Sequence, residues 1–219
     1  MGFQQDEAMN NIGKVFYVLL KEYGPQGWWP VNGKYSGGPK TGSERFEVCI
    51  GAILTQGTSW KNVEKAIESL KQNNALNQKA ILAMPVSKLA KLIKSSGYHN
   101  QKAKKLKEFV KFNGGLTREN LLSIWGIGPE TADSILLYAY KKPYFVVDAY
   151  TKRIFSRLGL CKEDCKYEWL QEMFYGNLPK NAKLFNEYHA LIVELAKRNC
   201  MKNPECKGCA LRKICQKRV

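Results

Sequence analysis

Four of the seven cysteines lie in the last twenty residues of the chain, with the spacing C-x5-C-x2-C-x5-C. They are Cys200, Cys206, Cys209 and Cys215. Four thiolates in so short a stretch can surround one tetrahedral metal ion or one iron–sulfur cubane, and the stretch is too small to fold around a core of its own. The spacing therefore predicts a metal centre that helps to fold the loop. Zinc and iron–sulfur both remain open, and a disulfide pair is the less favoured alternative.

A glycine-containing turn between two helical patterns forms a second candidate site. Within residues 118–140, an apolar helix ends before Gly126-Ile127-Gly128, and a second helix begins at Pro129. Proline suits the first helical position, where its missing N–H leaves no bond unmade. A helix, hairpin and helix in this order expose backbone N–H groups that can bind a phosphate without reading a base. An ordinary helical hairpin with glycines in its turn fits the spacing about equally well.

Asp148 stands between the apolar run Phe145-Val146-Val147 and a segment with helical spacing. Taken alone, this position favours an N-cap aspartate, whose carboxylate accepts hydrogen bonds from the first helical N–H groups. A catalytic carboxylate is the alternative. That alternative gains weight because the same chain also carries the hairpin and the cysteine loop.

The elements that position these residues are predicted to be helices. Apolar residues recur at helical spacing in several short segments, starting with a stripe that includes Met9, Ile12 and Phe16. Residues 23–43 are rich in Gly and Pro and predict a long irregular connection. No segment has a convincing alternating strand pattern. The sequence therefore predicts an all-α fold.

Charge points to the kind of partner. The 219 residues include 35 Lys and Arg against 19 Asp and Glu, which gives a net charge of +16 that both halves of the chain share. This exceeds the ~2–8 usual for a small domain, so a polyanion such as nucleic acid is expected, with a merely solvated surface as the alternative. No run of ~18 apolar residues and no export signal are found, so we expect a cytoplasmic, nucleoid-associated protein with no membrane partner.

Several segments together resemble one known family. GIGPETADSIL from residue 126, VVDAYTKRI from residue 146, ILTQGTSWKNV at 53–63, GYHNQKAKKL at 97–106 and the four-cysteine tail are similar to the helix-hairpin-helix base-excision glycosylases of the endonuclease III type. The resemblance implies two α-helical domains with a DNA cleft between them. One would span 43–142 and contain the hairpin. The other would join 1–42 to 143–219 and hold a [4Fe–4S] cluster on the four cysteines.

Two positions depart from the family pattern. Bifunctional members carry a nucleophilic lysine two residues after the second hairpin glycine, and here that position is Glu130. The family's aspartate is retained as Asp148. This pairing implies a monofunctional glycosylase that uses water and does not cut the strand. The first gap between the cluster cysteines is five residues instead of the usual six.

The finer resemblance is to the 3-methyladenine glycosylases of the MagIII and MpgII branch. It rests on Glu130, Asp148, Trp28-Trp29 before Pro30, and Phe46. In that branch an aromatic pocket accepts the flipped base, and aromatic faces attract a cationic alkylated purine by roughly 0.5–2 kcal/mol. The resemblance implies that Asp148 stabilises the sugar cation and that Glu130 polarises water or contacts the base. The alternatives are core packing for the aromatic residues and a first-turn helix acid for Glu130.

The same resemblance implies a monomer bound to damaged double-stranded DNA. Gln56 would fill the gap left by the extruded base. The predicted DNA-binding residues are Gln56, Gly126, Ile127, Gly128, Thr131, Lys207, Arg212 and Lys213. Alternative functions are a mismatch, uracil or oxidised-pyrimidine glycosylase and a non-catalytic module that binds damaged DNA.

Overall fold

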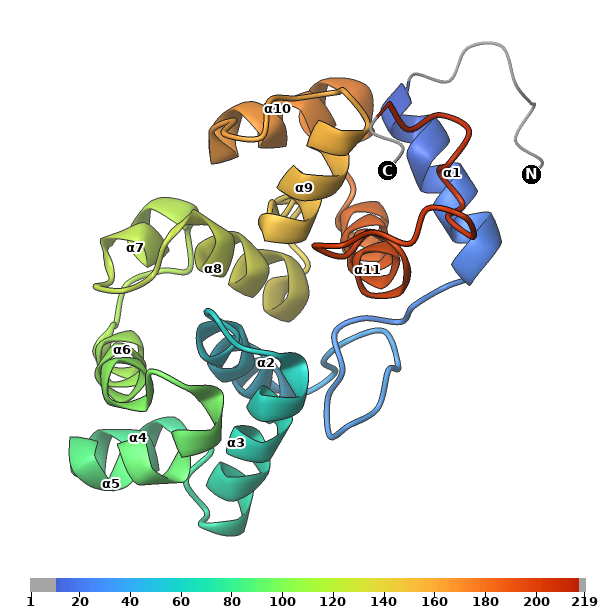
Figure 1. Ribbon diagram of the computed structural model, residues 1–219. Helices are drawn as coiled ribbons and strands as arrows, with labels where there is room; N and C mark the ends of the chain where they lie inside the picture. Colours follow the sequence, from blue (N-terminus) through green and yellow to red (C-terminus); the bar gives the residue numbers. More distant parts are fainter. Residues whose placement is uncertain (1–10, 217–219) are drawn as a thin grey trace. The chain divides into compact units, whose positions relative to one another are not determined.

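The computed structural model describes residues 11–216, and in this range the chain is helical without a β-strand (Figure 1). The only strand-like feature described is an isolated bridge between Val31 and Lys34. The predicted all-α class is therefore confirmed. Met9, which belongs to the predicted first helical stripe, lies outside the described residues.

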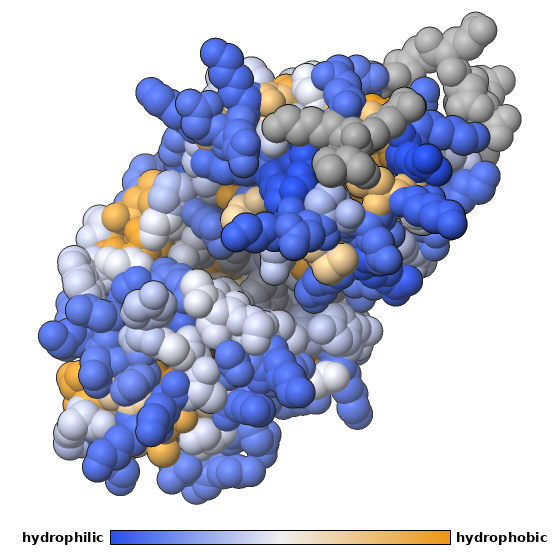
Figure 2. Space-filling view, viewed as in Figure 1, coloured by the Kyte–Doolittle hydropathy of each residue, from blue (hydrophilic) through white to orange (hydrophobic). Residues whose placement is uncertain are grey.

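The chain forms two compact units. Unit 1 comprises Met1–Gln26 and Phe145–Val219, of which residues 11–26 and 145–216 are described, and unit 2 comprises Gly27–Tyr144. None of the described helices is long and apolar enough to cross a membrane. Hydrophilic side chains cover most of the face shown in Figure 2, and apolar side chains appear there in small separate groups.

Unit 2 is built from short helices whose starts are fixed by polar caps. Thr41 accepts a hydrogen bond from the backbone of Glu44, whose side chain bonds back in a capping box, and Asn77 and Thr117 cap two further helices. The elements are α2 (Gly42–Leu54), α3 (Trp60–Gln72), α4 (Gln78–Ala83), α5 (Val86–Leu92), η1 (Lys94–Ser96), α6 (His99–Lys111), α7 (Arg118–Ser123), α8 (Pro129–Ser134) and the π-helical η2 (Ile135–Ala139).

Unit 1 packs around its longest helix. Its elements are α1 (Asn11–Tyr23), α9 (Ala149–Arg157), α10 (Tyr167–Asn177) and α11 (Ala182–Arg198). Tyr188 of α11 is fully buried, and its hydroxyl donates to the Ile12 carbonyl at 2.7 Å. Phe145 stacks on Phe174 with ring centroids 3.6 Å apart. Phe145 lies three residues before Asp148, so its packing in this core holds the chain at the start of α9.

Residues 27–42 belong to unit 2. The sequence analysis had placed them in the other domain, together with residues 1–26. Trp29 is buried against Trp60 and Tyr138, with ring centroids 5.2 and 4.8 Å away. These aromatic contacts hold a segment that carries no helical periodicity of its own.

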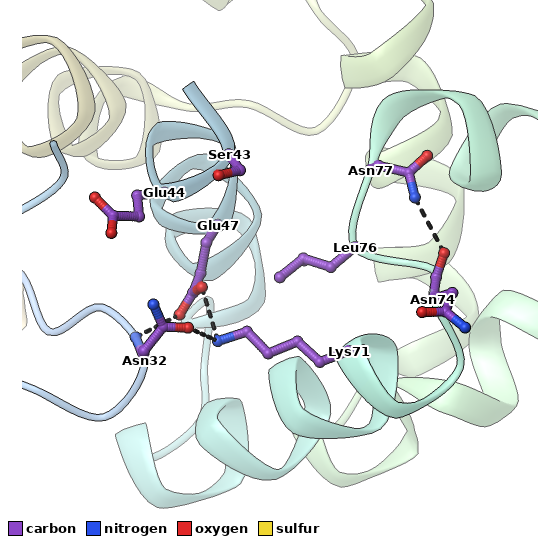
Figure 3. A pocket seen from close by; sticks show the side chains of 8 residues that line it. All are labelled: Asn32, Ser43, Glu44, Glu47, Lys71, Asn74, Leu76 and Asn77. Atoms are coloured by element: carbon purple, nitrogen blue, oxygen red, sulfur yellow. Dashed lines mark hydrogen bonds and ion pairs between the residues drawn. The ribbon is translucent and has the colours of Figure 1, made fainter. Parts of the chain in front are cut away.

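An ion pair and hydrogen bonds also hold the same segment (Figure 3). The Lys71 ammonium lies 2.8 Å from the Glu47 carboxylate and donates to the Asn32 side chain at 2.6 Å. The Asn32 backbone N–H in turn donates to Glu47 at 3.0 Å. These three residues line a pocket that contains none of the predicted site residues. Because Lys71 and Glu47 bind each other and Asn32, we interpret these contacts as an anchor for the loop.

Candidate functional site

Asp148 is the N-cap of α9, as its sequence position indicated. Its Oδ1 accepts hydrogen bonds from the Thr151 backbone N–H at 2.7 Å and from the Thr151 hydroxyl at 2.8 Å. The side chain is only 15% exposed. One carboxylate oxygen is therefore fully used in holding the start of the helix, and Oδ2 faces a different neighbour.

That neighbour is His189 on α11, a residue that the sequence analysis did not single out. Its Nε2 lies 3.5 Å from Oδ2 of Asp148, and the imidazole is almost completely buried. At this distance the contact is electrostatic and too long for a good hydrogen bond. Burial raises the pKa of Asp148, but the charge of His189 and the hydrogen bonds from Thr151 outweigh it, so the pKa lies below its ordinary value. The surroundings therefore favour an ionised carboxylate.

The glycine turn of unit 2 is a tight connection between α7 and α8. Gly126 has a φ of +84°, and a Cβ placed there would lie 2.5 Å from Cγ of Lys105. Gly128 has an ordinary extended φ of −95° and caps α8 without a side-chain hydrogen bond. Nothing lies within 4 Å of the position that a Cβ at Gly128 would take. Glycine is therefore needed at the two positions for different reasons. Gly126 permits the positive φ of the turn, and Gly128 leaves the backbone open to a ligand.

A buried ion pair fixes the two helices of this hairpin. Arg118 of α7 donates through Nε and Nη2 to the two carboxylate oxygens of Asp133 on α8, at 2.7 and 3.2 Å. Asp133 is fully buried. A bidentate pair of this kind sets the mutual orientation of α7 and α8 as well as their separation. The open N–H groups at the start of α8 therefore stand on a rigid base.

Gln56, which was predicted to fill the gap left by an extruded base, is bound to the hairpin. Its Nε2 donates to the Gly126 carbonyl at 3.1 Å and to the Thr131 hydroxyl at 2.9 Å. Its Oε1 accepts from the Lys105 ammonium at 2.6 Å. Insertion of Gln56 into DNA would require these three bonds to be exchanged, so the gap-filling role stays a prediction.

The predicted aromatic pocket residues differ in burial. Trp29 is 5% exposed and belongs to the core cluster with Trp60 and Tyr138. Trp28 packs at the edge of the same cluster, with its ring centroid 6.0 Å from that of Trp29 and 6.1 Å from that of Tyr138, and it is half-buried, as is Phe46. Trp29 therefore packs in the core, which was the alternative interpretation, while Trp28 and Phe46 are less buried.

Glu130 occupies the first turn of α8 and is exposed, and Asp148 belongs to the other unit. An acid in the first turn also interacts favourably with the helix dipole. Its position therefore fits both interpretations offered by the sequence.

The four C-terminal cysteines line one small cavity, together with Arg157 and Arg212. Burial raises the pKa of the Cys209 thiol, and the nearness of the other three thiols raises it further. All four are free and partly exposed. Within residues 11–216, no three His, Cys, Asp or Glu side chains are placed to hold a metal ion together. The donor set of four thiols suits a thiolate-bound metal centre.

Protein hydrogen bonds also order this loop. Arg157 of α9 donates to the carbonyls of Met201 and Lys202 at 2.7 and 3.0 Å, and its Nη1 lies 3.3 Å from the Cys200 sulfur. Arg153 donates to the Cys200 carbonyl at 2.8 Å. The predicted DNA-binding side chains Lys207, Arg212 and Lys213 are all exposed on the same loop. The loop thus presents cations from a defined backbone.

Sequence reasoning missed three residues that the structure brings to these sites. His189 contacts Asp148, and Lys105 packs across the Gly126 turn. Tyr98 is 76% exposed and its ring lies beside Gly57, the residue after Gln56. The sequence contained one signal for His189: it is one of only two histidines in the chain, and it lies in an apolar helical segment. An exposed ring of this kind is suited to stacking on a base.

Comparisons with known proteins agree with this architecture. The protein named "Putative DNA repair glycosylase MJ1434" from Methanocaldococcus jannaschii is 47% identical over 96% of this chain and 98% of its own. Endonuclease III of Thermotoga maritima is 33% identical over 80% of this chain and 84% of its own. The Helicobacter pylori 3-methyladenine DNA glycosylase MagIII, solved with 1,N6-ethenoadenine, is 31% identical with a TM-score of 0.72 and covers 86% of this chain and 98% of its own.

A structure of an endonuclease III–DNA complex shares the fold, with a TM-score of 0.77 at 20% identity over 95% of this chain and 96% of its own. The model of the HhH-GPD superfamily of base excision DNA repair proteins matches residues 50–180, which contain both the hairpin and Asp148. The chain therefore belongs to the HhH-GPD superfamily and is a base excision repair DNA glycosylase.

Proposed function

We propose that this glycosylase is monofunctional and removes alkylated purines, such as 3-methyladenine and 7-methylguanine, by hydrolysis of the N-glycosidic bond. The observation that carries the proposal is the environment of Asp148, whose lowered pKa keeps the carboxylate ionised. A 3-methylated adenine is cationic and already a good leaving group. The main demand on the enzyme is then to stabilise the sugar cation, which a preorganised anion does without reorganisation.

In this proposal, Asp148 acts through charge and through orientation of water. Thr151 holds Oδ1, and Oδ2 accepts the proton of a water as that water attacks the anomeric carbon. His189 stabilises the ionised form of the carboxylate from 3.5 Å. The leaving base departs with the electrons of the broken C–N bond, which neutralise its positive charge.

Glu130 is the basis for proposing hydrolysis without strand cleavage. Schiff-base chemistry needs an amine nucleophile, and Glu130 offers a carboxylate at the start of α8. Trp28 and Phe46 are proposed to face the flipped base, because these two residues are only half-buried. A cationic base gains from such aromatic faces in a way that a neutral pyrimidine does not. The 31% identity to a 3-methyladenine glycosylase supports this specificity.

DNA is proposed to bind through the open N–H groups of the hairpin and the cations of the cysteine loop. Gly128 leaves room for a phosphate to approach the backbone, and Ile127 is buried and fixes the turn. Lys207, Arg212 and Lys213 would add sequence-independent attraction that weakens as salt rises.

We also propose that Cys200, Cys206, Cys209 and Cys215 hold a [4Fe–4S] cluster, which would fix the loop that carries these cations. The four thiols already line one cavity. Purified protein is expected to be brown, with absorbance near ~400 nm and iron in stoichiometric amount. A colourless protein with one equivalent of zinc would show that the four cysteines hold zinc and not an iron–sulfur cluster.

The function is tested by incubating the protein with duplexes that contain single lesions and measuring released base. Release of 3-methyladenine or 7-methylguanine, with strand breaks appearing only after alkali, is the expected result. Nicking before alkali would show a lyase. Oxidised pyrimidines, an alternative substrate class named in the sequence analysis, are included as the second class. Lesion binding without release on any duplex would favour a non-catalytic binding module.

A further inference from the structure

An open groove on unit 2 runs beside the hairpin and has no role in the function described so far. It has a volume of about 640 Å³ and is lined by α6, the start of α5 and the residue before the hairpin turn. Its polar and aromatic lining residues are Gln101, Lys104, Lys107, Glu108, Lys111 and Trp125. Positive charge dominates this lining, because Glu108 is its only acid.

The three lysines form a stripe along one face of α6. Lys104, Lys107 and Lys111 follow at intervals of three and four residues, which places them above one another on the helix. They extend over ~10 Å of helix axis, a length that matches about three nucleotides of one strand at ~3.4 Å each. The stripe therefore has the dimensions of a short stretch of sugar–phosphate backbone.

Internal partners neutralise only part of this stripe. Lys111 pairs with Glu108 at 3.0 Å, and Lys107 donates to the Leu82 carbonyl at 2.7 Å. The side chain of Lys104 makes no hydrogen bond or ion pair with any residue in 11–216. Burial and the nearby Lys111 lower the pKa of Lys107. Three cations that are held close to one another with a single internal anion favour an additional external one.

Trp125 connects the stripe to the hairpin. Its side chain is 55% exposed at the groove, and the next residue is Gly126 of the phosphate-binding turn. An exposed indole beside lysines suits stacking on a sugar or a frayed base, which is the combination found in channels that follow a nucleic acid strand. An acidic peptide would satisfy the lysines, but continuity with the hairpin favours the strand that the hairpin holds.

We propose that this groove binds the sugar–phosphate backbone of the DNA flank that leaves the hairpin, and so extends the footprint by about three nucleotides. The inference rests on the proposed binding of DNA at the hairpin. It does not depend on which base is excised, and its test is made on binding rather than on base release.

The test compares two variants that lose the same charge. K104Q/K107Q/K111Q removes the stripe, and K14Q/K162Q/K183Q removes three exposed lysines of unit 1. Affinity is measured on duplexes that extend to different lengths on one or the other side of a central lesion, at several salt concentrations. A circular dichroism melt of both variants checks that each is folded.

We expect wild-type affinity to rise when one particular flank is lengthened and the stripe variant to lose that rise, becoming about tenfold to a hundredfold weaker on the long duplex. The slope of log K against log salt should fall by about two to three for the stripe variant on that duplex. Both variants should match wild type on the shortest duplex. The unit 1 variant should keep the dependence on length.

W125A provides a second measurement, with W125F as its control. We expect W125A to weaken binding of the long flank while W125F retains it, because phenylalanine preserves a stacking face. Equal losses in the two lysine variants, or a loss that is the same at every duplex length, would overturn the proposal. If alkylated bases are not released but length-dependent binding persists, the proposed specificity fails and the groove assignment stands.

Discussion

Asp148 and the Gly126–Gly128 turn are both proposed to act on DNA, yet they are built by opposite means. Asp148 depends on groups from two different helices, because Thr151 of α9 binds one oxygen of the carboxylate and the His189 side chain of α11 lies near the other. The turn depends on the backbone and on missing side chains, with Gly126 at a positive φ and Gly128 facing open space. A carboxylate is needed where charge develops, whereas a phosphate can be held by any properly placed N–H groups.

The difference separates two kinds of sensitivity. A change that keeps the shape of Asp148 but removes its charge should abolish chemistry and spare binding. A change that adds one methyl group to the turn should affect binding and spare the carboxylate.

The largest effect is expected for Asp148→Asn. The amide keeps the cap, because its oxygen still accepts from Thr151, but it loses the negative charge. We expect single-turnover base release to fall by about 10²–10⁴-fold. Binding to a lesion duplex should change by less than about threefold. A variant that releases base at the wild-type rate would remove Asp148 from the mechanism.

The next effect compares the two glycines of the turn. Gly126→Ala forces a Cβ into a positive φ and against Lys105, so we expect it to destabilise the fold by ~1–3 kcal/mol as well as weaken DNA binding. Gly128→Ala meets nothing and has an ordinary φ, so its stability should change by less than ~0.5 kcal/mol. Its DNA affinity should nevertheless fall about tenfold, because the new methyl group occupies the space of the phosphate.

Chemical denaturation of both glycine variants measures their free energy of unfolding, and a DNA titration measures their affinity for DNA. If Gly128→Ala binds DNA as tightly as wild type, the backbone of the turn does not contact a phosphate. If Gly126→Ala retains full stability, the positive φ is not a constraint on the fold.

The sequence was sufficient where the signal was local. The hairpin and the N-cap position of Asp148 each lie within about twenty residues and follow from turn and helix chemistry. The four cysteines that are close in sequence also line one cavity, and the centre that they would hold stays a prediction. It was insufficient where contacts join distant residues. His189 reaches Asp148 across 41 positions, and Gln56 reaches Gly126 across 70. No periodicity within a single helix encodes such pairs.

Residues 27–42 were expected to join residues 1–26, and their place in unit 2 also depends on contacts between distant residues. This Gly- and Pro-rich segment has no hydrophobic period, so its unit could be identified only from the contacts of Trp29 and from the tie between Asn32, Glu47 and Lys71. The same contacts explain why Trp29 is a core residue, although its neighbour Trp28 keeps accessible surface.

The smallest effect is expected for His189→Gln, which keeps a donor near Oδ2 of Asp148 but removes the imidazole. Because the charge of His189 lowers the pKa of Asp148, its loss should raise that pKa. Base release needs the ionised carboxylate, so activity disappears as the pH falls through the pKa of Asp148. The acid limb of the kcat/KM profile should therefore move to higher pH, while the rate on the plateau changes little.

His99→Gln is the matched control, because it removes the chain's other histidine from α6 in unit 2. Its profile should coincide with that of wild type. A purely structural role of His189 would lower the rate equally at every pH and leave the acid limb in place, which would contradict the prediction. A shift of the limb in His189→Gln alone would establish that the carboxylate's charge state is set by a residue of α11, from outside its own helix.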